Sequence, residues 1–488
     1  MVFNSPIKIS TVHFNITLKS CQRIMLLIGR HSTGRIKRYK IFSGGIAMKA
    51  TVKQYEKYTE DFCKFAHSSP DPFHAVDNVK NELEKQGFIR LYETEEWELS
   101  PGKGYFFIRN GCSLVAFKLP KDDFCGYNIF SCHGDSPAFK IKENPERVWE
   151  GAYVTLNVER YGGTVPYLWF DRPLSISGRV FVKEGSTVHS RLVDLKRNLL
   201  CIPSIAPHLR SPEEIYSKVK IQKEIQPLIS SDKDFSVKKL VANELGVKEQ
   251  DIVSHDLYLT PFEQGIIFGQ NREFFSSPRI DDLLCAFAGL SGFLKSKNSP
   301  SAGVFALFDN EEVGSGTRQG ALSDMLRLTF ERISLCLKRT KDRPCADLAN
   351  SFMVSADNGH ALHPGFPEKS DPTNRPTLGG GILIKHSANQ KYTTDGLSAA
   401  IFKTILQKAE IPFQDYVNHS DIAGGSTLGN LADRQVSVAT VDIGAAQLGM
   451  HSPLETGSVR DALQLSKAAE AFFNSRIKLK KDGGFSVD

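Results

Sequence analysis

Apolar residues recur at helical spacing near the start of the chain and at strand spacing further along it. Four aromatic residues, three or four positions apart, would share one face of a helix: Tyr55, Tyr58, Phe62 and Phe65. Ser69-Pro70-Asp71-Pro72 interrupts that pattern, and a second helix is predicted from about residue 73 to residue 85. Residues 104–118 and 126–132 are then typical of short strands.

Between about residues 143 and 265 the pattern changes to alternation. Residues 152–158 and 174–182 alternate apolar and polar side chains, as half-buried strands do, and turn signals such as Gly162-Gly163 separate them. This stretch predicts a separate β-rich domain.

After residue 265, short apolar runs alternate with helical segments. The runs 303–308, 351–354, 381–384 and 436–441 suit buried strands. Two sets of residues at helical spacing mark helices: Leu283, Phe287, Leu290 and Leu294, then Leu397, Ile401, Ile405 and Leu406. The alternation predicts an α/β fold with a sheet covered by helices.

The net charge of +6 arises at one end of the chain. Residues 1–47 carry eight Lys or Arg residues and no acidic residue. Without those eight, the 61 basic residues become fewer than the 55 acidic ones, so the body gives no reason to expect nucleic acid as a partner. We expect the extension to be either an organelle transit peptide or residues upstream of the true start at Met48, with the second interpretation preferred.

Two further observations indicate where the protein acts. The nine cysteines are dispersed without a Cys-x-x-Cys pair, which favours reduced thiols in a cytoplasmic protein over a disulfide framework or a thiolate zinc site. No uncharged apolar stretch reaches about 18 residues, so no membrane span is predicted. Import into an organelle would follow only from a real transit peptide.

Histidines and carboxylates follow the predicted strands, where sites form in open α/β sheets. They are His133 and Asp135, Asp309, Glu311 and Glu312, Asp357, and His451, with Asp281 and Asp282 at the start of a helix. A ligand set of two histidines and three of these carboxylates, without a thiolate, suits two divalent ions of the zinc class, with Mn²⁺ or Co²⁺ as alternatives in one site. One carboxylate would bridge the ions and another would take a proton from water. Each motif alone is compatible with a polar surface turn; their joint position favours a site.

Several of these segments resemble the motifs of a known family. They are His133-Gly134-Asp135-Ser136-Pro137, Ser276-Ser277-Pro278-Arg279-Ile280-Asp281-Asp282, Phe308-Asp309-Asn310-Glu311-Glu312-Val313-Gly314-Ser315, Ser355-Ala356-Asp357-Asn358-Gly359-His360, Gly424-Gly425-Ser426-Thr427-Leu428-Gly429 and Leu448-Gly449-Met450-His451-Ser452. In this order they resemble the aspartyl aminopeptidases, metallopeptidase family M18. The resemblance runs from about residue 50 to residue 475.

The resemblance implies a role for each matching residue. Asp281 would bridge two zinc ions, His133 and Asp357 would hold one ion, and Glu312 and His451 the other. Glu311 would be the general base, and Asp135 would fix the tautomer of His133. A cis peptide between Asp281 and Asp282 is also implied.

The same resemblance implies the substrate contacts. His360 and Lys385 would receive the side-chain carboxylate of the substrate's first residue, and Gly425 and Ser426 would bind the substrate backbone. For Lys385 the alternative is a surface lysine at a strand end, and for the glycine-rich run it is a tight turn.

The implied protein is a two-zinc aminopeptidase that removes N-terminal Asp or Glu from peptides. Its catalytic domain would comprise residues 48–142 and 266–488, with residues 143–265 as an inserted dimerisation domain. It would assemble as a homo-oligomer, a dodecamer built from dimers. Two alternatives stay open: a two-zinc aminopeptidase with neutral or broad preference, and a catalytically silent assembly protein of the same fold.

Overall fold

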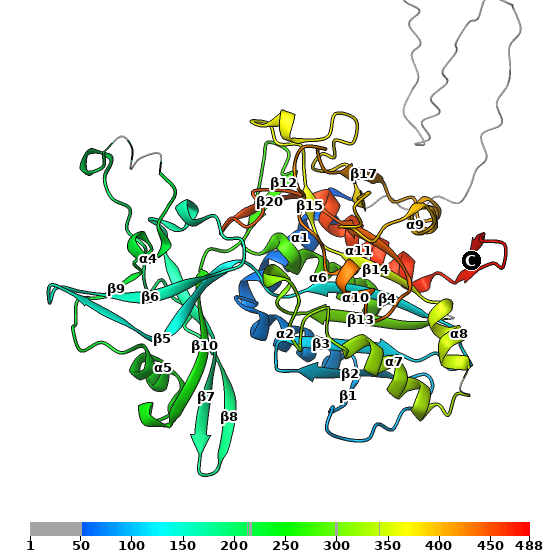
Figure 1. The fold of residues 1–488 in the computed structure, drawn as a ribbon, viewed down its shortest axis with the longest axis horizontal. Coiled ribbons are helices and arrows are strands. Elements are labelled where there is room, and N and C mark those ends of the chain that lie inside the picture. Colours follow the sequence, from blue (N-terminus) through cyan, green and yellow to red (C-terminus); the bar gives the residue numbers. More distant parts are fainter. Residues whose placement is uncertain (1–50, 212, 214–216, 298–300, 341) are drawn as a thin grey trace, which may run out of the picture. The chain divides into compact units, whose positions relative to one another are not determined.

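A computed structural model of the chain describes residues 51–211, 213, 217–297, 301–340 and 342–488 (Figure 1). The predicted extension at residues 1–47, with Met48, lies outside the described residues. No helix in the described ranges is both long enough and apolar enough to cross a membrane.

The two helices predicted at the start are confirmed, and each begins at a side-chain cap. Helix α1 (Val52–Ser68) follows Thr51, whose side chain accepts from the amide of Gln54 in a capping box. Helix α2 (Pro72–Lys85) follows Asp71, whose carboxylate accepts from the amides of Phe73 and His74. The proline-containing break is therefore the end of one helix and the cap of the next.

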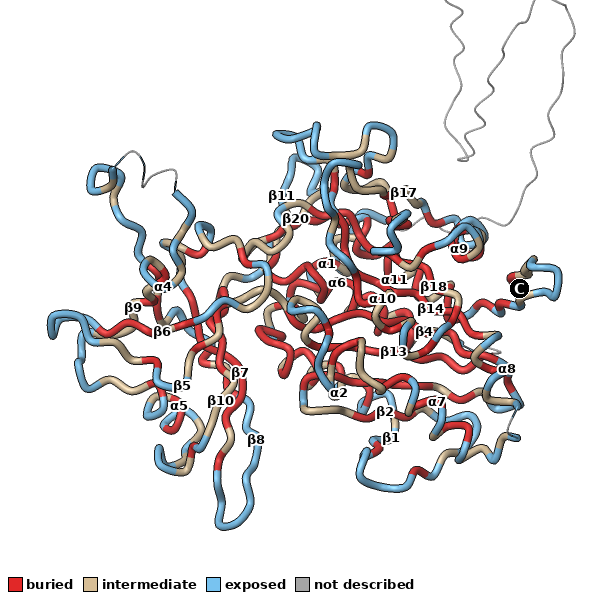
Figure 2. Tube along the Cα trace, viewed as in Figure 1, coloured by how far each residue is buried: buried red, intermediate tan, exposed pale blue. Residues whose placement is uncertain are grey.

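A nine-stranded mixed sheet forms the body of the α/β fold. Its order is β1 (Ile89–Arg90), β2 (Gly104–Arg109), β3 (Ser113–Lys118), β13 (Ala302–Phe308), β4 (Tyr127–His133), β14 (Phe352–Ala356), β18 (Ala439–Gly444), β16 (Ile382–His386) and β17 (Phe413–Val417). Strands β13, β4, β14 and β18 run parallel at its centre. Figure 2 shows that β13, β4 and β14 are buried along their length.

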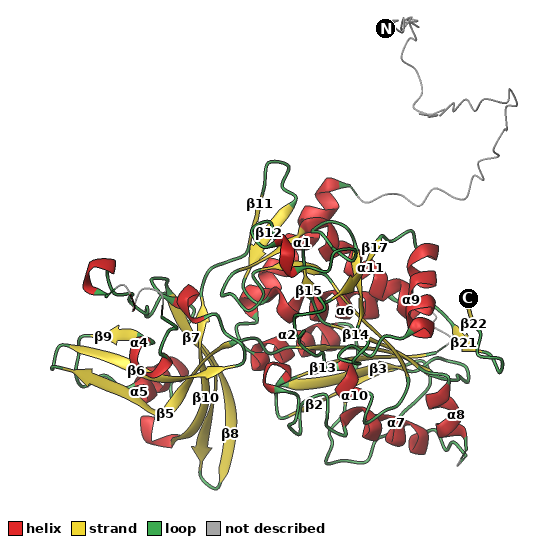
Figure 3. Ribbon diagram, turned by 45° about the horizontal axis from the view of Figure 1, so that its top comes forward, coloured by secondary structure: helices red, strands yellow, loops and turns green. Residues whose placement is uncertain are grey.

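Helices cover both faces of this sheet (Figure 3). One core cluster joins the sheet to α1, α2, α6 (Ile280–Lys295), α9 (Gly396–Lys408) and α11 (Val459–Asn474). A second cluster joins the other face to α7 (Met325–Cys336). Successive residues of β13 show the strand period, because Phe305 and Leu307 enter the first cluster while Val304 and Ala306 enter the second. The predicted sheet covered by helices is confirmed.

A separate six-stranded antiparallel sheet corresponds to the predicted β-rich stretch. Its order is β8 (Thr187–Asp194), β7 (Leu174–Glu184), β10 (Ile252–Pro261), β5 (Ala138–Trp149), β6 (Tyr153–Tyr161) and β9 (Leu228–Ser230). It has its own core, to which α5 (Val237–Leu245) contributes. The domain boundaries at residues 143 and 265 stay a prediction.

A third sheet joins segments that are distant in sequence. Its order is β11 (Ile266–Phe268), β12 (Phe274–Ser277), β20 (Glu455–Ser458), β19 (Ala446–Leu448) and β15 (Gly359–His360). The short pair β21 (Ile477–Leu479) and β22 (Phe485–Val487) lies near the C-terminal end. The strand predicted at 436–441 was wrong at its start: it begins at Ala439, because the amide of Val438 bonds the Asp433 side chain instead.

Candidate metal centre

Three parallel strands end at one edge of the nine-stranded sheet and deliver the predicted residues there. His133 is the last residue of β4, Asp357 follows β14 directly, and the turn after β13 carries Glu311 and Glu312. Because β4 pairs in parallel with both β13 and β14, these residues meet at the same edge. His451 reaches the same place from the turn between β19 and β20, and Asp281 from the first turn of α6.

Asp281 lies between the two histidines. Its Oδ1 is 3.7 Å from Nε2 of His133, and its Oδ2 is 3.6 Å from Nε2 of His451. Asp281 belongs to two groups of potential metal ligands, one with His133 and Asp357 and the other with Glu312 and His451. Within each group the ligand atoms lie within 4.8 Å of one another. One carboxylate is therefore shared by two compact His-and-carboxylate sets.

The side chains fit divalent cations. Oδ1 of Asp281 and Oε1 of Glu312 are buried and accept no hydrogen bond from the described residues. Buried carboxylate oxygens without a partner are costly unless a cation compensates them. Imidazole and carboxylate without thiolate is a donor set that zinc accepts.

Electrostatic crowding shifts the pKa values of the cluster. Burial raises the pKa of Glu311 to about 8, with His133 opposing and neighbouring carboxylates such as Asp357 adding to the rise. Burial opposes ionisation of Asp281 as well, but the hydrogen bond from His451 and nearby positive charges lower its pKa. Burial lowers the pKa of His133, but the hydrogen bond to Asp135 and the charges of Asp282 and Glu311 together raise it well above its usual value. A divalent cation bound in the cluster would compete with protons for these carboxylates and imidazoles.

Asp135 holds the loop that carries the two glutamates. Its carboxylate oxygens accept from the backbone amides of Glu311 and Glu312, each at 3.2 Å. Its backbone carbonyl lies 3.1 Å from Nδ1 of His133, and its Oδ1 lies 3.4 Å from the same nitrogen. Nδ1 of His133 therefore faces Asp135, which leaves Nε2 directed at Asp281.

The peptide between Asp281 and Asp282 is cis, as the resemblance implied. Asp282 is fully buried, and its Oδ2 accepts from the backbone amide of His133 at 3.3 Å. Asn358, next to Asp357, donates to the carbonyl of Ile280 at 2.8 Å. These contacts tie the start of α6 to the ends of β4 and β14.

Glu455 is a site residue that sequence reasoning missed. It is buried, and its two carboxylate oxygens accept from the backbone amides of Asp281 at 2.8 Å and His451 at 2.7 Å. His451 has a left-handed φ of 68°, which is uncommon for a non-glycine residue, and the Glu455 bond supports that conformation. No motif or spacing in the sequence marks it as a site residue.

The residues predicted to contact substrate are in different environments. Lys385 is 2% exposed, donates to Oδ1 of Asp357 at 3.2 Å and lies over the ring of Tyr392. It is therefore not the surface lysine of the alternative interpretation. His360 is exposed, and desolvation together with the charge of Lys385 lowers its pKa. Gly425 and Ser426 lie in an exposed segment, and in the described residues no hydrogen bond joins them to the metal-ligand groups.

Residues 65–473 match the sequence profile of the Aminopeptidase I zinc metalloprotease family, M18. A probable M18 family aminopeptidase 2 from Clostridium acetobutylicum is 40% identical over 432 residues, which cover 87% of this chain and 100% of the relative. The aspartyl aminopeptidase of Dictyostelium discoideum is 34% identical over 480 residues, which cover 88% of this chain and 98% of that protein.

The fold is also similar to solved structures. The mApe1 dodecamer of S. cerevisiae superimposes with a TM-score of 0.76 at 29% identity, covering 86% of this chain and 97% of that one. Because the match covers 86% of the chain, it includes at least part of both the α/β body and the β-rich sheet.

Glu455→Gln should weaken zinc binding by roughly 10- to 100-fold, the usual effect of removing a partner that orients metal ligands. The amide can accept from only one of the two backbone N–H groups and turns its own NH₂ towards the other. Zinc affinity measured by competition with a chromogenic chelator tests this, with Glu410→Gln at an exposed position as the control. An unchanged affinity would show that Glu455 does not position Asp281 and His451.

Proposed function

The chain belongs to the M18 family of zinc aminopeptidases, and on that premise we propose that it uses two zinc ions to remove an N-terminal Asp or Glu residue from peptides. The observation that carries the two-ion proposal is the position of Asp281, with one carboxylate oxygen 3.7 Å from His133 and the other 3.6 Å from His451. A carboxylate that serves two ions needs this arrangement.

We assign His133 and Asp357 to one ion, Glu312 and His451 to the other, and Asp281 to both. Zinc suits these donors, and Mn²⁺ or Co²⁺ would be accepted in one site. When bound, the ions would polarise the scissile carbonyl and lower the pKa of water in the site. The residues that would hold the ions come from separate helices, strands and turns, so the ligand set forms only when the chain is folded.

Glu311 is the proposed general base. It precedes Glu312 in the same short turn, and Asp135 holds the amides of both. Burial raises its pKa to about 8, and divalent cations bound beside it would lower that pKa again, so that the carboxylate would be ionised and able to accept a proton at neutral pH. Glu311 would take a proton from the attacking water and deliver it to the leaving amine. Asp135 would fix the orientation of the His133 ring and the position of the turn that carries Glu311 and Glu312.

The proposed acidic preference depends on Lys385 and His360. Asp357 accepts one hydrogen bond from the Lys385 ammonium, which has three donors, so others are available to a substrate carboxylate. His360 is exposed beside it and could donate to the same group. Gly425 and Ser426, in their exposed segment, would offer backbone amides to the substrate main chain.

The assembly is proposed to be a homo-oligomer, a dodecamer built from dimers, by similarity to the S. cerevisiae mApe1 dodecamer. The six-stranded sheet would mediate dimerisation. Its edge strand β8 is exposed along most of its length, as Figure 2 shows, which supports a role in contacts between copies. The proposed compartment is the cytoplasm, supported by the dispersed free cysteines.

The purified chain should release the first residue from Asp- and Glu-peptides faster than from Gln- or Leu-peptides, and a chelator should abolish the activity. Measuring initial rates on these four substrates, before and after chelation and zinc return, tests the proposal. Equal rates on all four would favour the enzyme of broad preference. No turnover by a zinc-loaded protein would favour the silent assembly protein.

Glu311→Gln should lower kcat by about 10² or more while zinc content stays near two per chain, because a general base supplies roughly that factor. Metal analysis and steady-state kinetics on a Glu-peptide check both parts. Loss of a zinc ion in this variant would mean that Glu311 and Glu312 have exchanged the assigned roles.

Lys385→Met should lower kcat/KM for Glu-peptides roughly 10- to 100-fold more than for Gln-peptides, since a hydrogen bond to a charged group is worth about 1.5–3 kcal/mol. Glu and Gln side chains have nearly the same shape but differ in charge, so the loss of the Asp357 ion pair should affect both substrates alike. Zinc content is measured alongside, with Lys385→Arg as the charge-retaining control. An equal loss on both substrates would remove Lys385 from the specificity pocket.

A further inference from the structure

The end of strand β6 brings a tyrosine from the six-stranded sheet to the metal centre. The hydroxyl of Tyr161 donates to Oδ2 of Asp135 at 2.7 Å and accepts from Nδ2 of Asn310 at 2.9 Å. Asp135 is fully buried. A hydroxyl from one sheet therefore orients a carboxylate that belongs to the other.

Asp135 transmits this contact to three residues of the proposed site. The same carboxylate accepts from the amides of Glu311 and Glu312, and Asp135 also faces Nδ1 of His133. Its Oδ2 receives both the Tyr161 hydroxyl and the Glu312 amide. Removing the hydroxyl would free the carboxylate to rotate away from the amides it holds.

The two residues after Tyr161 lie against the other half of the centre. The carbonyl of Gly163 is 3.2 Å from Nδ1 of His451, so it accepts the imidazole proton and leaves Nε2 for a metal ion. A Cβ on Gly163 would lie 2.7 Å from that Nδ1, and a Cβ on Gly162 would lie 2.9 Å from Cβ of Glu312. Only glycine allows the backbone to approach so closely.

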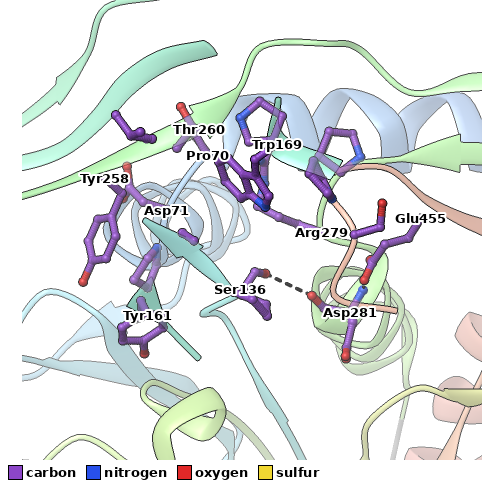
Figure 4. A pocket seen from close by; sticks show the side chains of 18 of the residues that line it. Pro70, Asp71, Ser136, Tyr161, Trp169, Tyr258, Thr260, Arg279, Asp281 and Glu455 are labelled. Atoms are coloured by element: carbon purple, nitrogen blue, oxygen red, sulfur yellow. Dashed lines mark hydrogen bonds between the residues drawn. The ribbon is translucent and has the colours of Figure 1, made fainter. Parts of the chain in front are cut away.

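The meeting of the two sheets at this point is visible in Figure 4. A cavity of about 30 Å³ is lined by Tyr161 and Tyr258 on the side of the six-stranded sheet, and by Asp281 and Glu455 on the side of the centre. Ser136, between them, donates to the carbonyl of Asp281 at 3.0 Å. The six-stranded sheet and the centre therefore meet beside Asp281.

We propose that Tyr161, Gly162 and Gly163 form a positioning segment, through which the six-stranded sheet holds the ligands of both metal ions. Tyr161 acts through Asp135 on His133 and the glutamate turn, and Gly163 acts directly on His451. The proposal rests on the two-zinc function proposed above. It makes metal affinity depend on a part of the chain that supplies no ligand.

Tyr161→Phe removes only the hydroxyl and should weaken zinc affinity by roughly 10- to 100-fold, with kcat falling and the melting temperature close to that of the wild type. The control is Tyr258→Phe: its ring packs against that of Tyr161 at 5.7 Å, and its hydroxyl bonds no other described residue. Zinc affinity is measured by chelator competition on the full chain. An affinity within twofold of the wild type, or an equal loss in the control, overturns the proposal for Tyr161.

Gly163→Ala should displace the His451 ring and lower the zinc content from two ions towards one. The control is Gly396→Ala, where a Cβ meets no atom within 4 Å. Retention of two ions at wild-type affinity overturns the proposal for Gly163. If Tyr161→Phe does not fold, the Gly163 measurement decides the proposal alone.

Failure of the underlying function has a different signature in these experiments. A wild-type chain that neither binds two zinc ions nor hydrolyses peptides overturns the two-zinc proposal itself. A wild-type chain that does both, with variants that match it, overturns only the positioning segment.

Discussion

Carboxylates outnumber cationic side chains where β4, β13 and β14 end, and burial makes their mutual repulsion costly. Asp281, Asp282 and Glu312 are buried there, with Lys385 as the one lysine bonded to the cluster in the described residues. Burial raises the pKa of Glu312 well above its usual value, so the protein side chains do not balance the charge by themselves. Divalent cations would supply the missing positive charge, and the chain belongs to a family of zinc metalloproteases. The strand order, the start of α6 at Asp281 and the contacts with the six-stranded sheet all bring these charged side chains together and hold them in place.

The centre is supported by carboxylates that bind backbone amides. Asp135 holds the amides of Glu311 and Glu312, and Glu455 holds those of Asp281 and His451. Hydrogen bonds to a charged acceptor are stronger than neutral ones, and here they fix the main chain of the ligands. Because the supporting bonds end on the backbone, the ligand side chains keep their oxygens and nitrogens free for metal ions. Asp135 and Glu455 bind backbone amides in the same way, and together they fix the relative positions of ligands that come from different sheets.

Much of this arrangement could be predicted from the sequence, and the exceptions have physical causes. Strand periodicity identified β4, β13 and β14, and the position of polar residues after them identified His133, Glu312 and Asp357. Glu455 was missed because a carboxylate that binds amides has no characteristic spacing. Gly162-Gly163 was interpreted only as a turn between strands, although its glycines are required by contacts with Glu312 and His451 that are remote in sequence. The five-stranded sheet was missed for the same reason, since its strands are two to four residues long and come from distant segments.

The position of Lys385 links substrate recognition to metal binding. Its ammonium is buried, and the neighbouring Asp357 raises its pKa despite that burial, so it stays charged. The same Asp357 is a proposed metal ligand, so its carboxylate would be shared between Lys385 and the ion. A substrate carboxylate bound by Lys385 would compete with Asp357 for the ammonium. With a weaker hydrogen bond from Lys385, the Asp357 carboxylate would donate more strongly to the metal ion. An acidic first residue would in this way make Asp357 a stronger oxygen donor to the ion, an effect that a neutral residue would not produce.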